Sequence, residues 1–298
     1  MRKLFGAIEA GGTKFNCMVA TDPNHITEEI RISTTNPTET IEKSVAFFRP
    51  YLAKNELAAV GIASFGPIDL NISSPTYGYI TTTPKPGWRM ADIYGQVQQA
   101  LGIPVAFDTD VNAAAFGEYS WVEANHQLDP FVYITVGTGI GVGVLINGSL
   151  LHGLLHGEAG HLRIPHDLSQ DPFKGMCPFH NDCLEGLASG PAMQKRWGTP
   201  AETLPDDHPA WQLEAEYLAY CIANLICTLS PRRIVLGGGV MHQAGLLQKV
   251  QQQVLHILNG YIHVPELLEQ MDNYIVSPSL GNRSGMLGAI ALAKQLME

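Results

Sequence analysis

Three glycine-rich clusters contain the residue types that hold phosphate groups. In chain order they are Gly11-Gly12-Thr13-Lys14, Gly137-Thr138-Gly139 and Gly237-Gly238-Gly239. Glycine amides can approach an anion without obstruction by side chains, and a threonine hydroxyl and a lysine add further partners. Each cluster alone is compatible with an ordinary tight turn, but the three together favour a triphosphate site. None has the GxxxxGK[ST] spacing of a P-loop, and the third lacks the GxGxxG spacing of a dinucleotide-binding turn.

Two aspartates stand where a predicted strand ends and a predicted helix begins. Asp108 closes the strand Val105–Asp108, and Asp110 lies two residues before the start of the helix Asn112–Glu123. A carboxylate at such a position can reach into a cleft and act as general base on a sugar hydroxyl, and Asp110 is the better candidate. The alternative is that an aspartate caps the helix. The two roles are compatible, with one aspartate in each.

Cysteine and histidine occur at a spacing that suits a metal. Cys177, His180 and Cys183 form a Cys-x2-His-x2-Cys pattern. Thiolates and imidazoles favour tetrahedral zinc, and four protein ligands leave no position for water, as in structural sites. The alternative is two buried cysteines beside a surface histidine. Spacing leaves the fourth ligand open among four histidines: His152, His156, His161 and His166.

Two glutamates lie close to this cysteine cluster in the sequence. Glu158 and Glu185 could each offer paired acceptors to neighbouring sugar hydroxyls. Either could instead be a solvated surface charge. The aromatic residues Tyr77, Tyr79 and Trp88 could stack on a sugar or pack against the protein, and the sequence does not separate these interpretations.

The predicted elements place these residues at turns. The strands Leu4–Ile8 and Phe15–Ala20 form a hairpin with the first cluster at its tip, and Phe131–Val136 with Val142–Ile146 does the same for the second. Two such hairpins, half a chain apart, indicate a duplicated lobe. The third cluster follows the strand Ile234–Leu236. Helices alternate with strands and predict an α/β chain: Thr38–Leu52, Met90–Leu101, Ala210–Leu229, about Gln243–Leu258 and Ser284–Leu296, with a further strand at Ala59–Ala63.

Composition limits the classes of function. The chain has 298 residues, 45% of them apolar, and a formal net charge of −10. This length favours two lobes of roughly 100–170 residues with a ligand cleft between them. Scattered basic residues and an acidic balance argue against nucleic-acid and anionic-membrane partners. No apolar run approaches ~20 residues, and no signal peptide is recognised, so a cytoplasmic protein is expected. Five cysteines favour reduced thiols or a metal over disulfides.

Several of these motifs together resemble the ROK family of sugar kinases and repressors. The similarity runs in order through residues 8–14 (IEAGGTK), 108–114 (DTDVNAA), 134–141 (ITVGTGIG), 157–161 (GEAGH) and 183–185 (CLE). Within that family, residues 64–70, 77–88 and 177–180 resemble the bacterial fructokinase branch.

The resemblance implies an actin-like, RNase H-like ATPase fold of the hexokinase type. Its small lobe is expected over residues 1–115 plus 284–298, with the first phosphate loop and the catalytic aspartate, and its large lobe over 116–283. By this similarity Asp110 is the base, and three residues contact the sugar: Glu158, His161 and Glu185. Zinc is held by four ligands: His161, Cys177, His180 and Cys183. ATP with Mg²⁺ is the expected phosphoryl donor, and a homodimer is the expected assembly.

The sequence therefore predicts a fructokinase that transfers the γ-phosphoryl group of ATP to the 6-hydroxyl of D-fructose. Mannose and glucose remain alternative substrates, although Thr109 stands where glucokinase-like members often have Asn. A sugar-sensing regulator is a remote alternative, because the first strand begins at Leu4 and leaves no room for an N-terminal helix-turn-helix.

Overall fold

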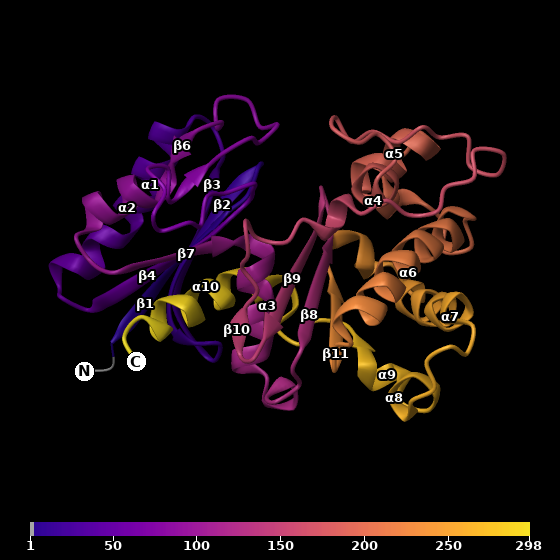
Figure 1. Ribbon diagram of the computed structural model, residues 1–298. Helices are drawn as coiled ribbons and strands as arrows, with labels where there is room; N and C mark the ends of the chain where they lie inside the picture. The colour runs from indigo at the N-terminus through magenta and orange to yellow at the C-terminus, as the bar shows by residue number, and fades with distance from the viewer. Residues whose placement is uncertain (1–2) are drawn as a thin grey trace. The chain divides into compact units, whose positions relative to one another are not determined.

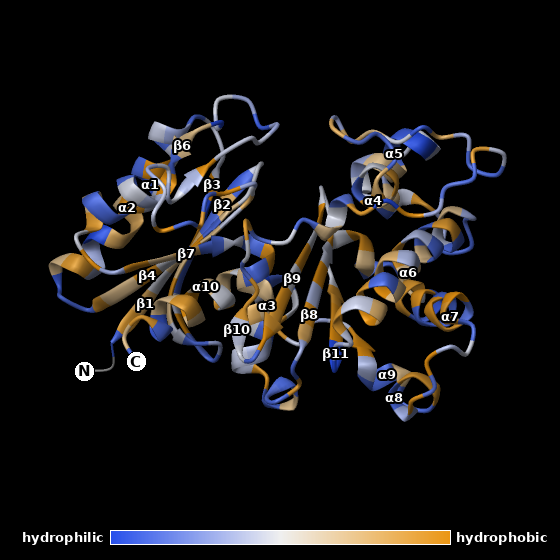
Figure 2. Ribbon diagram, in the orientation of Figure 1, coloured by the Kyte–Doolittle hydropathy of each residue, from blue (hydrophilic) through white to orange (hydrophobic). Residues whose placement is uncertain are grey.

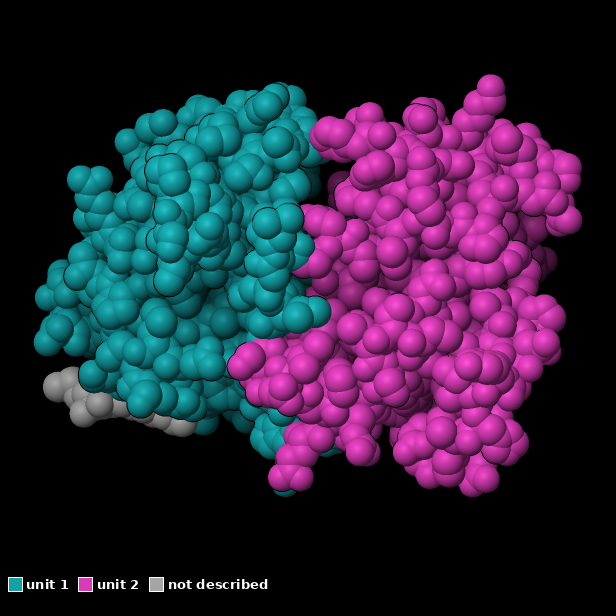
Figure 3. Space-filling view, in the orientation of Figure 1, with its two compact units in different colours: residues 1–126, 150–156, 279–298 teal, residues 127–149, 157–278 magenta. Residues whose placement is uncertain are grey.

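The computed structural model describes residues 3–298, which divide into two compact units (Figures 1 and 3). Unit 1 contains the chain up to His126, the segment Leu150–His156 and Ser279–Glu298. Unit 2 contains Gln127–Ser149 and Gly157–Pro278. The lobes expected from the sequence, 1–115 plus 284–298 and 116–283, divide the chain at other positions. Residues 116–126, 150–156 and 279–283, expected in the large lobe, group with unit 1 in the structure.

Unit 1 is built on a five-stranded sheet of order β3-β2-β1-β4-β7. β1, β2 and β3 are antiparallel, whereas β1, β4 and β7 are parallel. The predicted strands and the first hairpin are confirmed, but β3 was not predicted, because its side chains are mostly exposed and polar. The strands are β1 Leu4–Ala10, β2 Lys14–Asp22, β3 His25–Ser33, β4 Leu57–Ser64 and β7 Val105–Thr109.

Helices cover both faces of this sheet. Val60 and Ile62 of β4 belong to the core cluster that includes residues of α1 (Pro37–Ala53) and α2 (Ile93–Leu101). Gly61, between them, faces Ala289 of α10 (Ser284–Gln295). Since successive side chains of a strand point to opposite faces, α10 lies on the face opposite α1 and α2. α3 (Asp110–Trp121) packs beside α10.

The segment before α2 is folded into unit 1. It contains the short strands β5 (Tyr79–Ile80) and β6 (Ala91–Asp92). Trp88 is fully buried, stacks near Phe15 with ring centroids 5.2 Å apart, and donates its Nε1–H to the Thr35 carbonyl at 2.9 Å. Trp88 is therefore a core residue that packs against the protein and does not stack on a sugar.

Unit 2 repeats the strand order of unit 1. Its sheet runs β10-β9-β8-β11-β12, with β8 and β9 antiparallel and β8, β11 and β12 parallel. In each unit the first strand pairs with the second as a hairpin and with the fourth in parallel, which confirms the predicted duplication. The strands are β8 Phe131–Val136, β9 Ile140–Ile146, β10 Ser149–Leu150, β11 Arg233–Gly237 and β12 Ile275–Val276.

The helices of unit 2 bury an apolar core against this sheet. Figure 2 shows hydrophobic residues concentrated along β8, β9 and α6, and these elements contribute to one core cluster. The predicted helix at Gln243 begins later, at Leu246, after Gly245 adopts φ +76°. The helices are α4 Leu184–Ala188, α5 Gly190–Trp197, α6 Ala210–Leu229, α7 Leu246–Leu258, α8 Pro265–Leu268 and α9 Met271–Tyr274.

Short 3-10 helices complete the chain, at Glu123–Asn125, Ala159–His161, Ala201–Thr203, Gly239–His242 and Gly281–Arg283. Across residues 3–298, no helix has both the length and the apolar character needed to span a bilayer.

Close packing of α10 in unit 1 predicts a strict requirement for glycine. A Cβ at Gly288 would lie 1.7 Å from the carbonyl oxygen of Ala113 in α3. Gly288→Ala should therefore lower the free energy of unfolding by about 3 kcal/mol, because two helix backbones must separate. Urea denaturation measures this change. Gly153→Ala is the matched control, since its Cβ meets only a carbonyl oxygen 4.0 Å away, and an unchanged midpoint for Gly288→Ala would contradict the packing.

Candidate functional site

In unit 1, the first glycine cluster and Asp110 lie at the same edge of the sheet. The register pairs Ala10 with Ser64, and Ser64 with Thr109, so β1, β4 and β7 end side by side. The glycine turn follows β1, and Asp110 follows β7. This is the carboxyl edge of the parallel strands, where open α/β sheets bind their ligands. The structure thus brings these two predicted elements together.

The junction between β7 and α3 is held by a buried carboxylate. Asp108 is 3% exposed, and its Oδ1 accepts from the Thr109 amide at 2.8 Å and from Asn112 Nδ2 at 2.7 Å. The helix cap is Thr109, whose Oγ1 accepts from the Asn112 amide at 3.1 Å. The expectation that an aspartate caps α3 is therefore wrong, since a threonine hydroxyl fills that place.

Asp110 is the first residue of α3 and is partly exposed. Its Oδ1 accepts from the Val111 amide at 2.8 Å. The helix dipole at this end of α3 favours a negative charge. The carboxylate therefore lies at the hydrogen-bonded β7–α3 junction, at the carboxyl edge of the sheet.

The first glycine turn has an open side. Gly11 donates its amide to the Lys14 carbonyl at 3.0 Å and accepts from Thr34 Oγ1 at 2.7 Å. A Cβ built on Gly12 would meet no atom of the described chain within 4 Å. Thr13 and Lys14 are exposed. Nothing in residues 3–298 thus explains glycine at position 12 by packing, which fits an approach of a ligand to its backbone.

The second and third glycine clusters lie together at one edge of the unit 2 sheet. The second joins β8 to β9, and the third begins at the end of β11, the parallel neighbour of β8. Gly238 adopts φ +95°, and a Cβ there would lie 2.3 Å from the Val136 carbonyl oxygen. Gly137 and Gly239, by contrast, have no described atom within 4 Å of a built Cβ. The two clusters therefore form one glycine-lined edge.

Two glutamates are brought together near this edge. Glu185 of α4 accepts from the Ile140 amide at 3.0 Å, beside Gly139. Although Glu158 is exposed in part, desolvation and the nearby Glu185 carboxylate raise the pKa of Glu158 to about 7. A carboxyl group with a pKa near neutrality can act as either donor or acceptor toward a hydroxyl group, so Glu158 has both capacities.

The Cys and His residues predicted to hold zinc converge in unit 2. The ligand atoms of His161, Cys177, His180 and Cys183 all lie within 4.8 Å of one another. His161 Nδ1 is 3.4 Å from Cys183 Sγ and 3.7 Å from Cys177 Sγ, and His180 Nδ1 is 3.7 Å from Cys177 Sγ. Tetrahedral zinc with Zn–S and Zn–N bonds of ordinary length separates such atoms by about 3.5 Å. The donor set and its dimensions therefore fit zinc.

The other three histidines considered as ligands lie elsewhere. His166 contacts Asp171 and Asp182. His152 and His156 belong to unit 1, where His152 Nε2 lies 2.9 Å from Asp108 Oδ2. The sequence pattern does not predict the contact of His152 with Asp108, since it offers His152 only as a candidate metal ligand. No spacing signal connects residues 44 positions apart.

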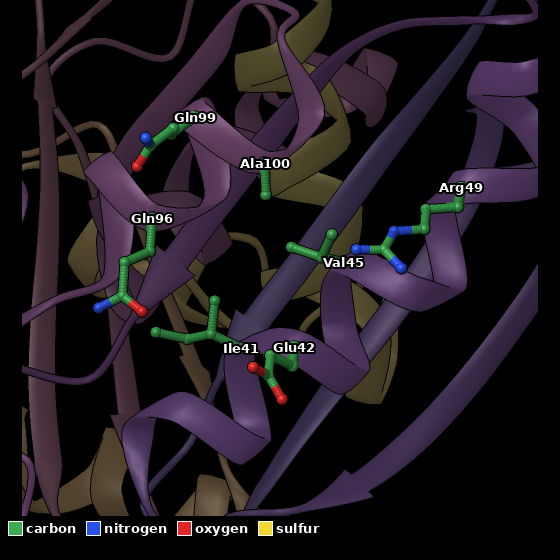
Figure 4. A pocket seen from close by; sticks show the side chains of 7 residues that line it. All are labelled: Ile41, Glu42, Val45, Arg49, Gln96, Gln99 and Ala100. Carbon is green, nitrogen blue, oxygen red and sulfur yellow. The ribbon is translucent and has the colours of Figure 1, made fainter.

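A surface groove of about 220 Å³ lies between α1 and α2 (Figure 4). Its lining includes Ile41 and Val45 of α1 and Gln96, Gln99 and Ala100 of α2. None of the residues predicted to bind sugar, phosphate or metal lines this groove.

Comparison with known proteins places the whole chain in one family. The ROK family profile matches residues 5–296. The fructokinase of Lactococcus lactis subsp. cremoris is 43% identical over 297 residues, covering 99% of both chains, and that of Streptococcus mutans is 44% identical over 300 residues, with the same coverage.

A solved structure supports the fold class. The ROK hexokinase of Thermus thermophilus superposes with a TM-score of 0.77 and 25% identity over 99% of each chain. This similarity confirms the predicted actin-like fold of the hexokinase type. The chain belongs to the ROK family.

Proposed function

We propose that this chain transfers the γ-phosphoryl group of ATP to the 6-hydroxyl of D-fructose. The observation that carries the proposal is the full-length similarity to two fructokinases. The glycine-lined sheet edges, the carboxylate at the start of α3 and the paired glutamates of unit 2 support it. Phosphoryl transfer asks a protein mainly to position reactants and neutralise charge, and these residue types do both.

Asp110 is the proposed general base. Its place at the first turn of α3 holds the carboxylate on a hydrogen-bonded junction, and its partial exposure leaves it accessible to a hydroxyl group. In a loose transition state the hydroxyl proton leaves late, so an aspartate of ordinary basicity can accept it as the new P–O bond forms.

The three glycine clusters are the proposed contacts for the phosphates of MgATP. A Cβ built at Gly12, Gly137 or Gly239 would meet no atom of residues 3–298 within 4 Å, which supports an approach of a ligand to these glycines. Backbone amides at such positions can donate to phosphate oxygens, and Lys14 supplies a positive charge. Mg²⁺ neutralises charge on the β- and γ-phosphates when it accompanies the nucleotide.

Glu158, His161 and Glu185 are the proposed sugar contacts. Glu185 can accept hydrogen bonds through its carboxylate oxygens, while Glu158 can donate or accept near neutral pH because its pKa is raised to about 7. His161 follows Glu158 in the 3-10 helix Ala159–His161, and its amide donates to the Glu158 carbonyl at 3.0 Å. Hydroxyl groups of a hexose match this set of donors and acceptors.

Zinc is proposed at His161, Cys177, His180 and Cys183, in a structural role. Four protein ligands leave no coordination position for a substrate. The ion would fix His161, and with it the segment that holds Glu158, without taking part in phosphoryl transfer. The expected homodimer stays a prediction.

Replacement of Asp110 tests the base. Asp110→Asn keeps the size of the side chain and removes its basicity, so kcat should fall by at least about 100-fold while KM for ATP changes little. A coupled assay of ADP release measures both constants. Asp207→Asn, at an exposed position in unit 2, is the control and should behave as the unchanged chain. A kcat for Asp110→Asn within tenfold of the unchanged protein would rule out the assignment.

Comparison of sugars tests the substrate. We expect kcat/KM to be at least about tenfold higher for D-fructose than for D-glucose or D-mannose, because the hydroxyl groups that meet Glu158 and Glu185 differ among them. Initial rates over a range of each sugar give the ratio. Equal values for D-fructose and D-mannose would support a broad hexose kinase instead.

Elemental analysis tests the metal. The purified chain should contain one equivalent of zinc, and Cys183→Ser should lose it and unfold at a lower temperature, because a thiolate ligand is removed. Cys227→Ser is the matched control, since this exposed cysteine lies outside the cluster and its replacement should leave the zinc content unchanged. Less than about half an equivalent in the unchanged protein argues against the site.

A further inference from the structure

A short segment, Leu150–His156, is attached to unit 1 although the chain on both sides belongs to unit 2. We refer to this segment as the strap. His152 and His156 pair across an antiparallel β-bridge within it. Both histidines reach unit 1, and each makes a different kind of contact there.

His156 anchors one end of the strap as a neutral imidazole. It is 6% exposed, and its Nε2 lies 3.1 Å from the backbone nitrogen of Ile68. A backbone N–H can only donate, so Nε2 must accept and the ring proton is carried by Nδ1. His156 is thus a structural anchor whose protonation state is set by a backbone amide.

His152 contacts the buried carboxylate that organises the β7–α3 junction. Asp108 uses Oδ1 for the Thr109 amide and Asn112 Nδ2, and Oδ2 lies 2.9 Å from His152 Nε2. A carboxylate that is 3% exposed is costly to bury unless its oxygens are hydrogen-bonded. His152 supplies a donor, and when protonated a positive charge, to this oxygen.

We propose that His152 is a positioning residue for the phosphoryl transfer. Its protonated imidazole holds Asp108, Asp108 holds Thr109 and Asn112, and this junction fixes the direction from which Asp110 meets the sugar hydroxyl. The inference rests on the proposed role of Asp110. His152 itself acts through Asp108 and needs no contact with either substrate.

The charged groups around His152 determine the sign of the pH effect. The hydrogen bond to Asp108 and the negative charge of Asp108 raise the pKa of His152, whereas partial burial of the imidazole lowers it by less. Asp110 lies two residues beyond Asp108, His156 lies across the bridge, and the pKa of Tyr77 is raised by burial, by Tyr94 and by Asp108. The charge on His152 is therefore present at low pH and lost as pH rises through a pKa above 6.5, so kcat should decline on that alkaline side.

The test uses two variants with steady-state kinetics over a range of pH. His152→Ala should lower kcat at least tenfold while KM for fructose and for ATP stays within threefold. His152→Gln retains a donor for Asp108 without a titrating charge, so it should recover part of kcat and lack the alkaline decline. Added imidazole should partly restore His152→Ala. His256→Gln, at an exposed position of α7, is the control and should match the unchanged protein.

Each outcome decides the proposal. A kcat for His152→Ala within twofold of the unchanged protein, or an alkaline decline retained in His152→Gln, overturns it. A lower melting temperature with unchanged kcat would mean that the strap only stabilises the fold. If both variants fail to fold, the pH profile of the unchanged protein decides, because no decline above pH 6.5 contradicts the proposal. Asp110→Asn is measured in parallel. If Asp110→Asn stays active, the proposed role of Asp110 as base is wrong. If Asp110→Asn is inactive while His152→Ala keeps full activity, only the positioning role of His152 is wrong.

Discussion

The burial of the Asp108 carboxylate is the constraint on which the β7–α3 junction depends. A carboxylate without water must receive hydrogen bonds from its own surroundings, and here they come from the Thr109 amide, Asn112 and His152. Those bonds fix where β7 ends and how α3 begins. The position of Asp110 depends on these hydrogen bonds, because Asp110 is the first residue of α3. The buried Asp108 carboxylate therefore helps to place the carboxylate of Asp110, the proposed base.

Glycine has two distinct functions in this chain. Gly61 and Gly288 are required by close contacts with neighbouring backbone, and any side chain would force α10 away from its partners. Gly12, Gly137 and Gly239 face open space, so packing does not account for them. Gly61 and Gly288 allow helices to pack closely in unit 1. Gly12, Gly137 and Gly239 leave backbone amides accessible at the sheet edges where phosphate binding is proposed.

Local patterns in the sequence were sufficient to predict the hairpins, the alternation of strands and helices and the Cys-x2-His-x2-Cys cluster. These features depend on neighbours in the chain, such as alternating apolar residues or ligands three positions apart. His161 was identified as the fourth member by resemblance and not by spacing, and the structure brings its Nδ1 to the two sulfurs. The sequence pattern does not predict β3, because an exposed polar strand lacks the alternation of apolar residues that identifies strands.

The contacts of the strap could not be predicted from sequence for a different reason. The pairing of His152 with Asp108 joins residues that are distant in the chain, and only the folded sheet and the bridge within the strap bring them together. The same holds for Trp88, whose burial against Phe15 depends on a segment without periodic structure. Sequence patterns identify residue types able to do chemistry, whereas tertiary packing selects which of them meet.

The most direct test of the proposed activity is to follow the reaction products by phosphorus NMR with the purified chain, MgATP and D-fructose. We predict that fructose 6-phosphate and ADP accumulate in equal amounts and that little inorganic phosphate appears when the sugar is left out. Phosphate esterified at the 1-hydroxyl, hydrolysis of ATP to inorganic phosphate without a sugar phosphate, or no consumption of ATP would contradict it.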